Sequence, residues 1–316
     1  MSNYYLFNSG VLSRNNNTLL FTTIDGVKNT IPINNVEDLY IFGKISFNTD
    51  LITFIYDSGI NLHIFDYYSN YKGLFLSSSG VKSGMMLVKQ VEKYNNDRLY
   101  ISRKILESAK YNIIQNLKSY NIDTSVVDAY NFDTCDSISK LMGVEGNIRK
   151  FYYKNFKNIT NRYKLTKRTK RPPLDEINSM ISFGNMLCYS ECIRAINKTG
   201  LSNSISFLHE LKESRNSLSL DISEILKPIV VDRIIFKLIN DNIIKDNDFD
   251  KNSNMCYLNN NGKKKFIQEW DNKMSTSFFH PKYNRNVSYK ELFKFETYKL
   301  LKYIMENGKY EPLKMW

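Results

Sequence analysis

The sequence predicts an α+β fold, in which a small β-rich domain precedes a larger, all-helical one. Residues 1–76 contain short runs of β-branched and aromatic residues, punctuated by Asn, Gly, Asp and Pro32. A small, polar stretch at 77–84 predicts a hinge. From residue 85 onward apolar residues recur at three-to-four spacing, the period of an amphipathic helix. Because 42% of the residues are hydrophobic, the composition supports packed cores and excludes a disordered chain.

In the β-rich region one segment departs from the strand pattern. After Asn48, either Thr49 or Asp50 is expected to cap a helix that ends at Gly59. The remaining runs are expected to be strands, and they are Tyr4–Asn8, Val11–Ser13, Thr18–Thr23, Val27–Ile31, Leu39–Ile45, Asn61–Phe65 and Gly73–Leu76.

The region 85–316 is expected to hold helices and no strands. A long amphipathic pattern covers 85–120. Further helical patterns follow at Ile138–Asn158, Leu174–Asn197, Ile222–Asn240, Lys263–Ser275 and Ser288–Asn307.

The distribution of charge indicates where a polyanion binds. The net charge is +12, which favours nucleic acid as a partner. Residues 1–80 carry four basic and six acidic residues, a net charge of −2, so the rest of the chain carries +14. A polyanion is therefore expected to bind after residue 80.

The N-terminus and the cysteines predict a cytoplasmic protein. The start MSNYYLFNSG resembles no signal peptide, and no apolar run approaches the ~20 residues that span a bilayer, so no membrane partner is expected. The four cysteines form no CxxC motif or disulfide framework, which fits a reducing compartment.

Three segments contain candidate catalytic side chains, and each has a structural alternative. Glu145 is expected at the start of a helix beside Gly146, but it also has the spacing of a helical ion pair with Arg149. Asp221 and Glu224 have the spacing of an N-cap and its N3 partner, so capping alone explains them. His209 lies at the end of the apolar stretch ISFLHE, so its alternative role is that of a structural histidine.

One histidine with two or three carboxylates suits a metal that works on phosphodiesters. Carboxylate oxygens are the ligands that Mg²⁺ prefers, and an imidazole makes the site tolerant of Mn²⁺ as well. Glu145, His209 and Glu224 lie far apart in sequence, so their spacing alone does not choose between ligation and the structural alternatives.

A dense basic run offers a phosphate-binding surface. RYKLTKRTKRPP places six cations before two prolines, and a basic segment with Tyr152 and Tyr153 lies just upstream. The run is either a solvated loop or a mobile arm that contacts phosphates, and the tyrosines either stack on bases or pack. The DNA-binding residues predicted on this basis are Arg149, Lys150, Lys154, Arg162, Lys164, Lys167, Arg168, Lys170 and Arg171.

Taken together, these segments resemble the integrase of CRISPR adaptation, the first CRISPR-associated (Cas-one) family. The matching stretches are LMGVEGNIRKFYY, KRPPLDEINSMISFGNMLCYS, SISFLHE, SLSLDISEILKPIVVDR and NVSYKELFKFETYKLLKYI. Their order and spacing, and the change from β-rich to helical sequence, agree with that family over nearly the whole chain. The FGN and LKP variants resemble the branch found with type I-B systems.

The resemblance implies that Glu145, His209 and Glu224 are catalytic metal ligands for Mg²⁺ or Mn²⁺. Asp221 would lie beside the metal as a supporting residue. Relatives often have Leu-Asp-Pro before the histidine motif, whereas this chain has Leu201-Ser202-Asn203, so a looser turn is expected.

The resemblance also implies the partners and the reaction. Two copies would form a homodimer through the β-rich domain, and dimers would bracket the small Cas-two protein. The assembly would insert a short double-stranded DNA fragment into the repeat array by transesterification from a 3′-hydroxyl. Two other functions stay open, namely a structure-selective, metal-dependent DNA endonuclease without joining activity and a non-catalytic architectural DNA-binding protein.

Overall fold

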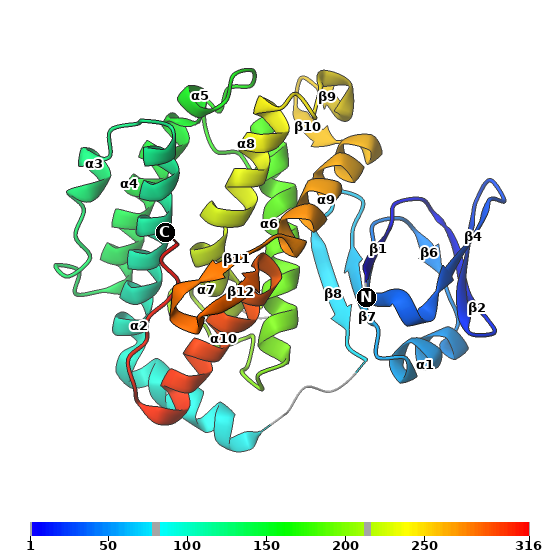
Figure 1. Ribbon diagram of the computed structural model, residues 1–316, viewed down its shortest axis with the longest axis horizontal. Coiled ribbons are helices and arrows are strands. Elements are labelled where there is room, and N and C mark those ends of the chain that lie inside the picture. Colours follow the sequence, from blue (N-terminus) through cyan, green and yellow to red (C-terminus); the bar gives the residue numbers. More distant parts are fainter. Residues whose placement is uncertain (1, 78–82, 212–215, 316) are drawn as a thin grey trace. The chain divides into compact units, whose positions relative to one another are not determined.

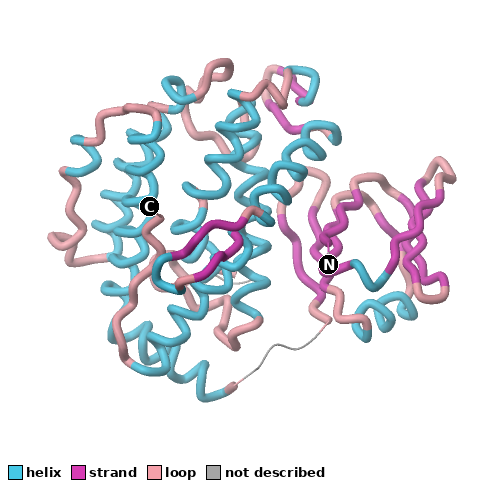
Figure 2. Tube along the Cα trace, in the orientation of Figure 1, coloured by secondary structure: helices cyan, strands magenta, loops and turns pink. Residues whose placement is uncertain are grey.

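A computed structural model describes residues 2–77, 83–211 and 216–315. The chain divides into two compact units, Met1–Gly80 and Val81–Trp316 (Figure 1). The first unit is rich in strands and the second in helices (Figure 2), so the predicted α+β class is confirmed. Most of the segment 77–84, for which a hinge is predicted, lies outside the described residues.

The N-terminal unit consists of two four-stranded sheets and one α-helix. In the first sheet, of order β1-β5-β7-β8, the first three strands run parallel and β8 is antiparallel to β7. The second sheet has the order β4-β3-β2-β6. The elements are β1 (Ser2–Leu6), β2 (Gly10–Asn15), β3 (Thr18–Thr23), β4 (Lys28–Pro32), β5 (Val36–Ile41), β6 (Ile45–Ser46), α1 (Thr49–Asp57), β7 (Asn61–Phe65) and β8 (Tyr71–Phe75).

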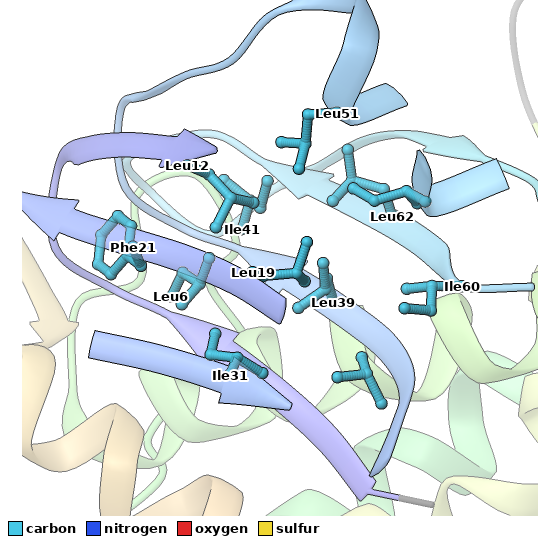
Figure 3. Close-up of a cluster of buried hydrophobic side chains, with 12 residues drawn as sticks. Leu6, Leu12, Leu19, Phe21, Ile31, Leu39, Ile41, Leu51, Ile60 and Leu62 are labelled. Atoms are coloured by element: carbon cyan, nitrogen blue, oxygen red, sulfur yellow. The ribbon is translucent and has the colours of Figure 1, made fainter. Parts of the chain in front are cut away.

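The two sheets share one hydrophobic core. Every second residue of β3 points inward, as a half-buried strand requires. Helix α1 adds Leu51 (Figure 3) and Ile55 to this core. The strand residues of this core include Leu6, Leu12, Leu19, Phe21, Ile31, Leu39, Ile41 and Leu62.

The cap of α1 differs from the prediction by one residue. The Asn48 side chain accepts a hydrogen bond from the backbone N–H of Leu51 at 3.0 Å, so Asn48 is the N-cap rather than Thr49 or Asp50. Asn and Asp are similarly good caps. Asn48 has the extended backbone conformation of an N-cap, whereas Thr49 and Asp50 already belong to the helix.

Helices make up most of the C-terminal unit. The long α2 packs against both α4 and α7. No described helix is long and apolar enough to cross a membrane. The helices are α2 (Gly84–Ser119), α3 (Ser125–Asp128), α4 (Ile138–Lys154), α5 (Phe156–Ile159), α6 (Glu176–Asn197), α7 (Ser217–Leu226), α8 (Arg233–Asn240), α9 (Asn260–Ser275) and α10 (Tyr289–Glu306).

Two short hairpins interrupt the helical pattern, although no strand is predicted after residue 85. Strands β9 (Phe249–Asn252) and β10 (Met255–Leu258) form one, and β11 (Ser277–His280) and β12 (Arg285–Ser288) form the other. Each strand has only four residues, and β9 and β12 are largely polar and exposed. Short polar strands carry too little alternation of hydrophobic residues to be recognised in sequence.

The helix predicted over Ile222–Asn240 is broken by a π-turn at Pro228–Asp232. Pro228 has no N–H to donate, and the backbone N–H of Asp232 reaches five residues back to the carbonyl of Lys227 at 3.0 Å. The wide turn therefore separates α7 from α8, and Asp232 is its last residue. Turns of this kind occur frequently at functional sites.

Helix α6 approaches this π-turn closely because Gly184 has no side chain. A Cβ atom at this position would lie 2.6 Å from the side chain of Val231 and 2.7 Å from that of Phe266. The glycine of the FGN motif thus allows the helices to pack tightly behind the π-turn.

Candidate active site

Helix α4 carries Glu145 and Arg149 one turn apart on the same face. The N-cap of α4 is Ser137, so Glu145 lies in the middle of the helix and not at its start, as the sequence had suggested. The guanidinium Nε of Arg149 donates to Oε1 of Glu145 at 3.1 Å, which is the helical ion pair that their spacing predicts.

Arg149 also contacts Glu224 of helix α7. One terminal nitrogen of its guanidinium donates to Oε2 of Glu224 in a short charged hydrogen bond. A single arginine thus joins two carboxylates that are 79 residues apart in sequence. All three side chains are largely buried, with exposed fractions of 21% for Glu145 and 11% for Arg149 and Glu224.

Asp221 does not cap helix α7, whose N-cap is Asn216. Its fully buried carboxylate accepts three backbone N–H groups from a different segment, those of Phe207, Leu208 and His209, at 2.6, 3.0 and 3.1 Å. The capping interpretation of the Asp221–Glu224 pair is therefore wrong. Asp221 instead fixes the turn that presents His209.

Asp221 also orients the imidazole of His209. Oδ1 of Asp221 lies 2.7 Å from Nδ1 of His209. Because Nδ1 is engaged there, Nε2 is the ring nitrogen that a metal would bind, and carboxylate–histidine pairs of this kind are typical of metal sites. The His209 side chain remains 22% exposed, so it is accessible from solvent.

Helix α2 holds the segment before His209 in place, which sequence reasoning did not foresee. The side-chain amide of Gln90 donates to the carbonyls of Ser202 and Ile205 at 3.0 and 2.9 Å and accepts the N–H of Ser202 at 2.8 Å. Arg98 donates to the carbonyl of Phe207 at 2.8 Å. The Leu201-Ser202-Asn203 turn, which was expected to be looser, is instead tied down by hydrogen bonds.

The charges around Glu224 keep it ionised. Burial alone would raise the pKa of this carboxyl, but the positive charges of Lys227 and Arg149 outweigh burial and hold the pKa well below its ordinary value. The Lys227 ammonium donates to Oε1 of Glu224 at 2.7 Å, and it lies 4.7 Å from the centre of the Tyr189 ring. Both oxygens of Glu224 therefore face cationic side chains.

Asp232 is a further buried carboxyl, within electrostatic range of Arg149, Lys227 and Glu224. Burial raises its pKa to about 6, against the attraction of Arg149. The Tyr152 hydroxyl, which accepts a hydrogen bond from Asn116 at 2.9 Å, also acts to lower this pKa. The Oδ2 atom of Asp232 has no hydrogen-bond partner among the described residues. Sequence reasoning found nothing that distinguished Asp232, because its position depends on the π-turn.

The candidate ligand side chains suit a divalent ion, whereas the ion pairs that the carboxylates make with Arg149 and Lys227 oppose its binding. Two carboxylates and an imidazole oriented through Nδ1 suit Mg²⁺ or Mn²⁺. In the structure, however, Arg149 and Lys227 bind the carboxylate oxygens. Within the described residues, no group of three or more His, Cys, Asp or Glu side chains is placed to hold a metal. The site thus has suitable ligands whose carboxylates are neutralised by the protein's own cations.

The residues predicted to bind DNA fall into two groups. Arg149 bridges carboxylates, Arg162 pairs with Asp246, and Arg168 donates to the side chains of Asn178 and Ser182. These three arginines are engaged within the protein. The side chains that are instead exposed are Lys150, Lys154, Lys164, Lys167, Lys170 and Arg171.

Lys170 lies within electrostatic range of the site. Partial desolvation and repulsion from Arg168 and Lys227 lower its pKa, while Glu224 and Glu145 act in the opposite direction. The basic run therefore extends from solvent toward the two carboxylates. Of the upstream tyrosines, Tyr152 is fully buried and packs in the core, and Tyr153 is half-buried.

Comparison with known proteins identifies the family. The model of the family described as CRISPR associated protein Cas1 matches residues 4–272. A CRISPR-associated endonuclease Cas1 of Clostridium perfringens is 41% identical over 99% of this chain and 98% of its own. The chain belongs to the Cas1 family.

Solved structures of similar proteins agree with this Cas1 assignment. A Cas1 protein from Thermotoga maritima has 34% identity and a TM-score of 0.87, with 97% of each chain covered. A casposase bound to an integration product shares the fold, with a TM-score of 0.85, 20% identity and coverage of 98% of this chain and 92% of its own. The narrower assignment to the type I-B branch stays a prediction.

Proposed function

We propose that this Cas1 protein is a metal-dependent DNA integrase of CRISPR adaptation. The observation that carries the proposal is that Arg149 joins Glu145 to Glu224, while the Asp221-oriented His209 and the basic run lie within electrostatic range of Glu224. A structural role alone does not require two carboxylates to share one buried arginine. Burying ionised groups costs several kcal/mol per ion before pairing offsets it, so such clusters are typical of functional sites.

Glu145, His209 and Glu224 would hold the divalent ion, Mg²⁺ or Mn²⁺. When bound, the ion would supply Lewis-acid activation of a hydroxyl and offset charge on a leaving oxygen. Asp221 keeps the imidazole in one orientation through Nδ1. The site residues are only partly exposed to solvent, which strengthens the electrostatic interactions among them.

The proposed reaction is a transesterification. The 3′-hydroxyl of a short DNA fragment attacks a phosphodiester of the repeat array, a new P–O bond forms, and the 3′-oxygen of the cut strand leaves with the proton. One bond is exchanged for another, so no external energy source is required. The exposed lysines of the basic run, with Arg171, would position both DNA segments through their phosphates.

The two units would have different functions. We propose residues 1–76 as a dimerisation domain, 77–84 as a hinge and 85–316 as the catalytic and DNA-binding domain, in the cytoplasm. The net charge of −2 over residues 1–80 suits protein contacts better than DNA contacts. The partners proposed are a second copy of the chain, the small Cas-two protein and double-stranded DNA. The casposase of the same fold, which is bound to an integration product, supports the DNA assignment.

A nuclease that cuts DNA without joining it is the alternative that an observation favours, because the relative from Clostridium perfringens is named an endonuclease. The same ligands would then activate water. A fragment with a blocked 3′-end separates the two functions, because it abolishes joining and leaves hydrolysis intact. The third possibility, an architectural DNA binder, predicts that chelators change nothing and that His209→Ala loses only stability.

The test is a strand-joining assay with Mn²⁺ and a fragment carrying a free 3′-end. Glu145→Ala, His209→Ala and Glu224→Ala should each lose joining by at least about 10²-fold while DNA binding survives. Glu311→Ala is the matched control, since this carboxylate is 65% exposed and pairs only loosely, at 3.5 Å, with Lys282. Normal joining by the three variants would show that the site is wrongly assigned.

A further inference from the structure

Arg149 occupies the place where a divalent cation would be expected. Its guanidinium contributes one positive charge between Glu145 and Glu224, and its planar fork lets it reach both carboxylates together. A divalent ion that binds the same two carboxylates competes with this guanidinium for their oxygens. The structure thus shows the carboxylates already paired, and binding of an ion has to break that pairing.

Asp232 is a third buried carboxylate within electrostatic range of Arg149. It is only 2% exposed, and Arg149 is the foremost of the positive charges that act on it. Its Oδ2 atom lacks a hydrogen-bond partner among the described residues. A buried carboxylate oxygen without a partner costs free energy and calls for an explanation.

The surroundings of Asp232 are rigid. Tyr152 acts on its carboxyl, and Asn116 donates both to the Tyr152 hydroxyl and to the carbonyl of Pro228, at 2.9 and 2.7 Å. The π-turn fixes the backbone of Asp232 itself. Asp232 is therefore held in position, so Arg149, with its long side chain, is the partner that would move.

We propose that Arg149 is a displaceable counter-ion, which neutralises Glu145 and Glu224 in the metal-free chain and transfers to Asp232 when a divalent ion takes its place. The inference rests on the proposed metal site. It assigns a positioning role to Asp232, which otherwise has no contact that explains its burial as a charged group. It also explains why suitable ligands are present while no three of them, among the described residues, stand ready for a metal.

The exchange also balances charge. An incoming ion brings two positive charges to carboxylates that Arg149 and Lys227 already pair. If the guanidinium stayed between them, it would repel the ion at close range. Its transfer to Asp232 removes that repulsion and gives the buried carboxylate a partner. The free chain has a reduced apparent affinity, because only the fraction with Arg149 released is competent to bind.

Mn²⁺ binding to the full-length chain tests this without any measurement of activity, with free Mn²⁺ followed by electron paramagnetic resonance. Arg149→Gln removes the competitor and should tighten binding on the order of tenfold. Arg149→Lys keeps the charge but loses the fork, so it should also tighten binding. A purely electrostatic effect predicts no change for the lysine variant. Arg285→Gln, which breaks an arginine–carboxylate pair elsewhere in the unit, should leave binding unchanged.

Asp232→Asn removes the acceptor and should weaken Mn²⁺ binding on the order of threefold to tenfold. In the Arg149→Gln background the same substitution should have no further effect, because there is no guanidinium left to receive. A full Asp232→Asn effect in that background would overturn the role of Asp232.

The remaining outcomes separate this inference from the proposed function. Wild-type binding that neither Arg149 variant tightens would overturn the displacement and leave the metal site standing. No Mn²⁺ binding by the wild-type chain would overturn the metal site and this inference with it.

Discussion

Replacement of Asp232 by asparagine should stabilise the metal-free protein at neutral pH. The structure raises the pKa of Asp232 from the ordinary 3.8 to about 6, mainly through burial. Below pH 3.8 the carboxyl is protonated in both the folded and the unfolded chain. Between pH 3.8 and about 6 the folded chain retains a proton that the unfolded chain has released, so the free energy of unfolding falls as the pH rises. Above pH 6 the loss is complete.

The size of this loss follows from the two pKa values. A change from 3.8 to about 6 corresponds to about 3 kcal/mol. Asparagine has nearly the shape of a protonated aspartic acid and does not titrate. Asp232→Asn should therefore match the wild type near pH 4 and exceed it by as much as about 3 kcal/mol at pH 7.

Urea unfolding in the presence of a chelator, at pH values from about 4 to 8, measures this difference. Asp133→Asn is the control, because the side chain of Asp133 is 73% exposed and its replacement should change stability little. A variant that is less stable than the wild type at neutral pH, or a gap that does not change with pH, would refute the reasoning. A carboxylate that costs stability and is nevertheless present fits a functional role.

Three further predictions concern the surroundings of the site. Asp221→Ala should lower the free energy of unfolding by about 3 kcal/mol or more, because it removes a buried acceptor of three backbone N–H groups. Thermal melts followed by circular dichroism measure this loss, with Ser125→Ala as the control variant. Gln90→Ala should slow joining roughly tenfold with DNA affinity unchanged, because His209 loses its fixed turn; a drop in affinity instead would place Gln90 at the DNA. Joint neutralisation of Lys164, Lys167, Lys170 and Arg171 should reduce the slope of log affinity against log salt by about 0.9 for each phosphate that the protein no longer neutralises, whereas an unchanged slope would make the run an ordinary solvated loop.

Local patterns in the sequence predicted most of the fold. The alternation of apolar residues located the strands of the first unit, and the three-to-four period located the long helix α2. The predictions were wrong where a contact between residues far apart in sequence determined the structure, or where the segment was short and polar. The hairpin strands Phe249–Asn252 and Arg285–Ser288 belong to the second kind.

The site was only partly accessible to sequence reasoning. The pair of Glu145 and Arg149 follows from helical spacing, but the second bond of Arg149, to Glu224, depends on how two helices pack. Asp221 has the spacing of a helix cap and in fact accepts N–H groups of a turn 12 to 14 residues away. Spacing within one segment does not reveal such a contact, because it is the tertiary fold that brings the partners together.

The presence of a divalent ion at Glu145, His209 and Glu224 is the central claim. A crystal soaked in Mn²⁺ and measured for anomalous scattering tests it most directly. The account predicts one peak beside both carboxylates and Nε2 of His209, with the Arg149 guanidinium moved away from Glu224. Mn²⁺ bound elsewhere, or no peak at a concentration that supports strand joining, would contradict it.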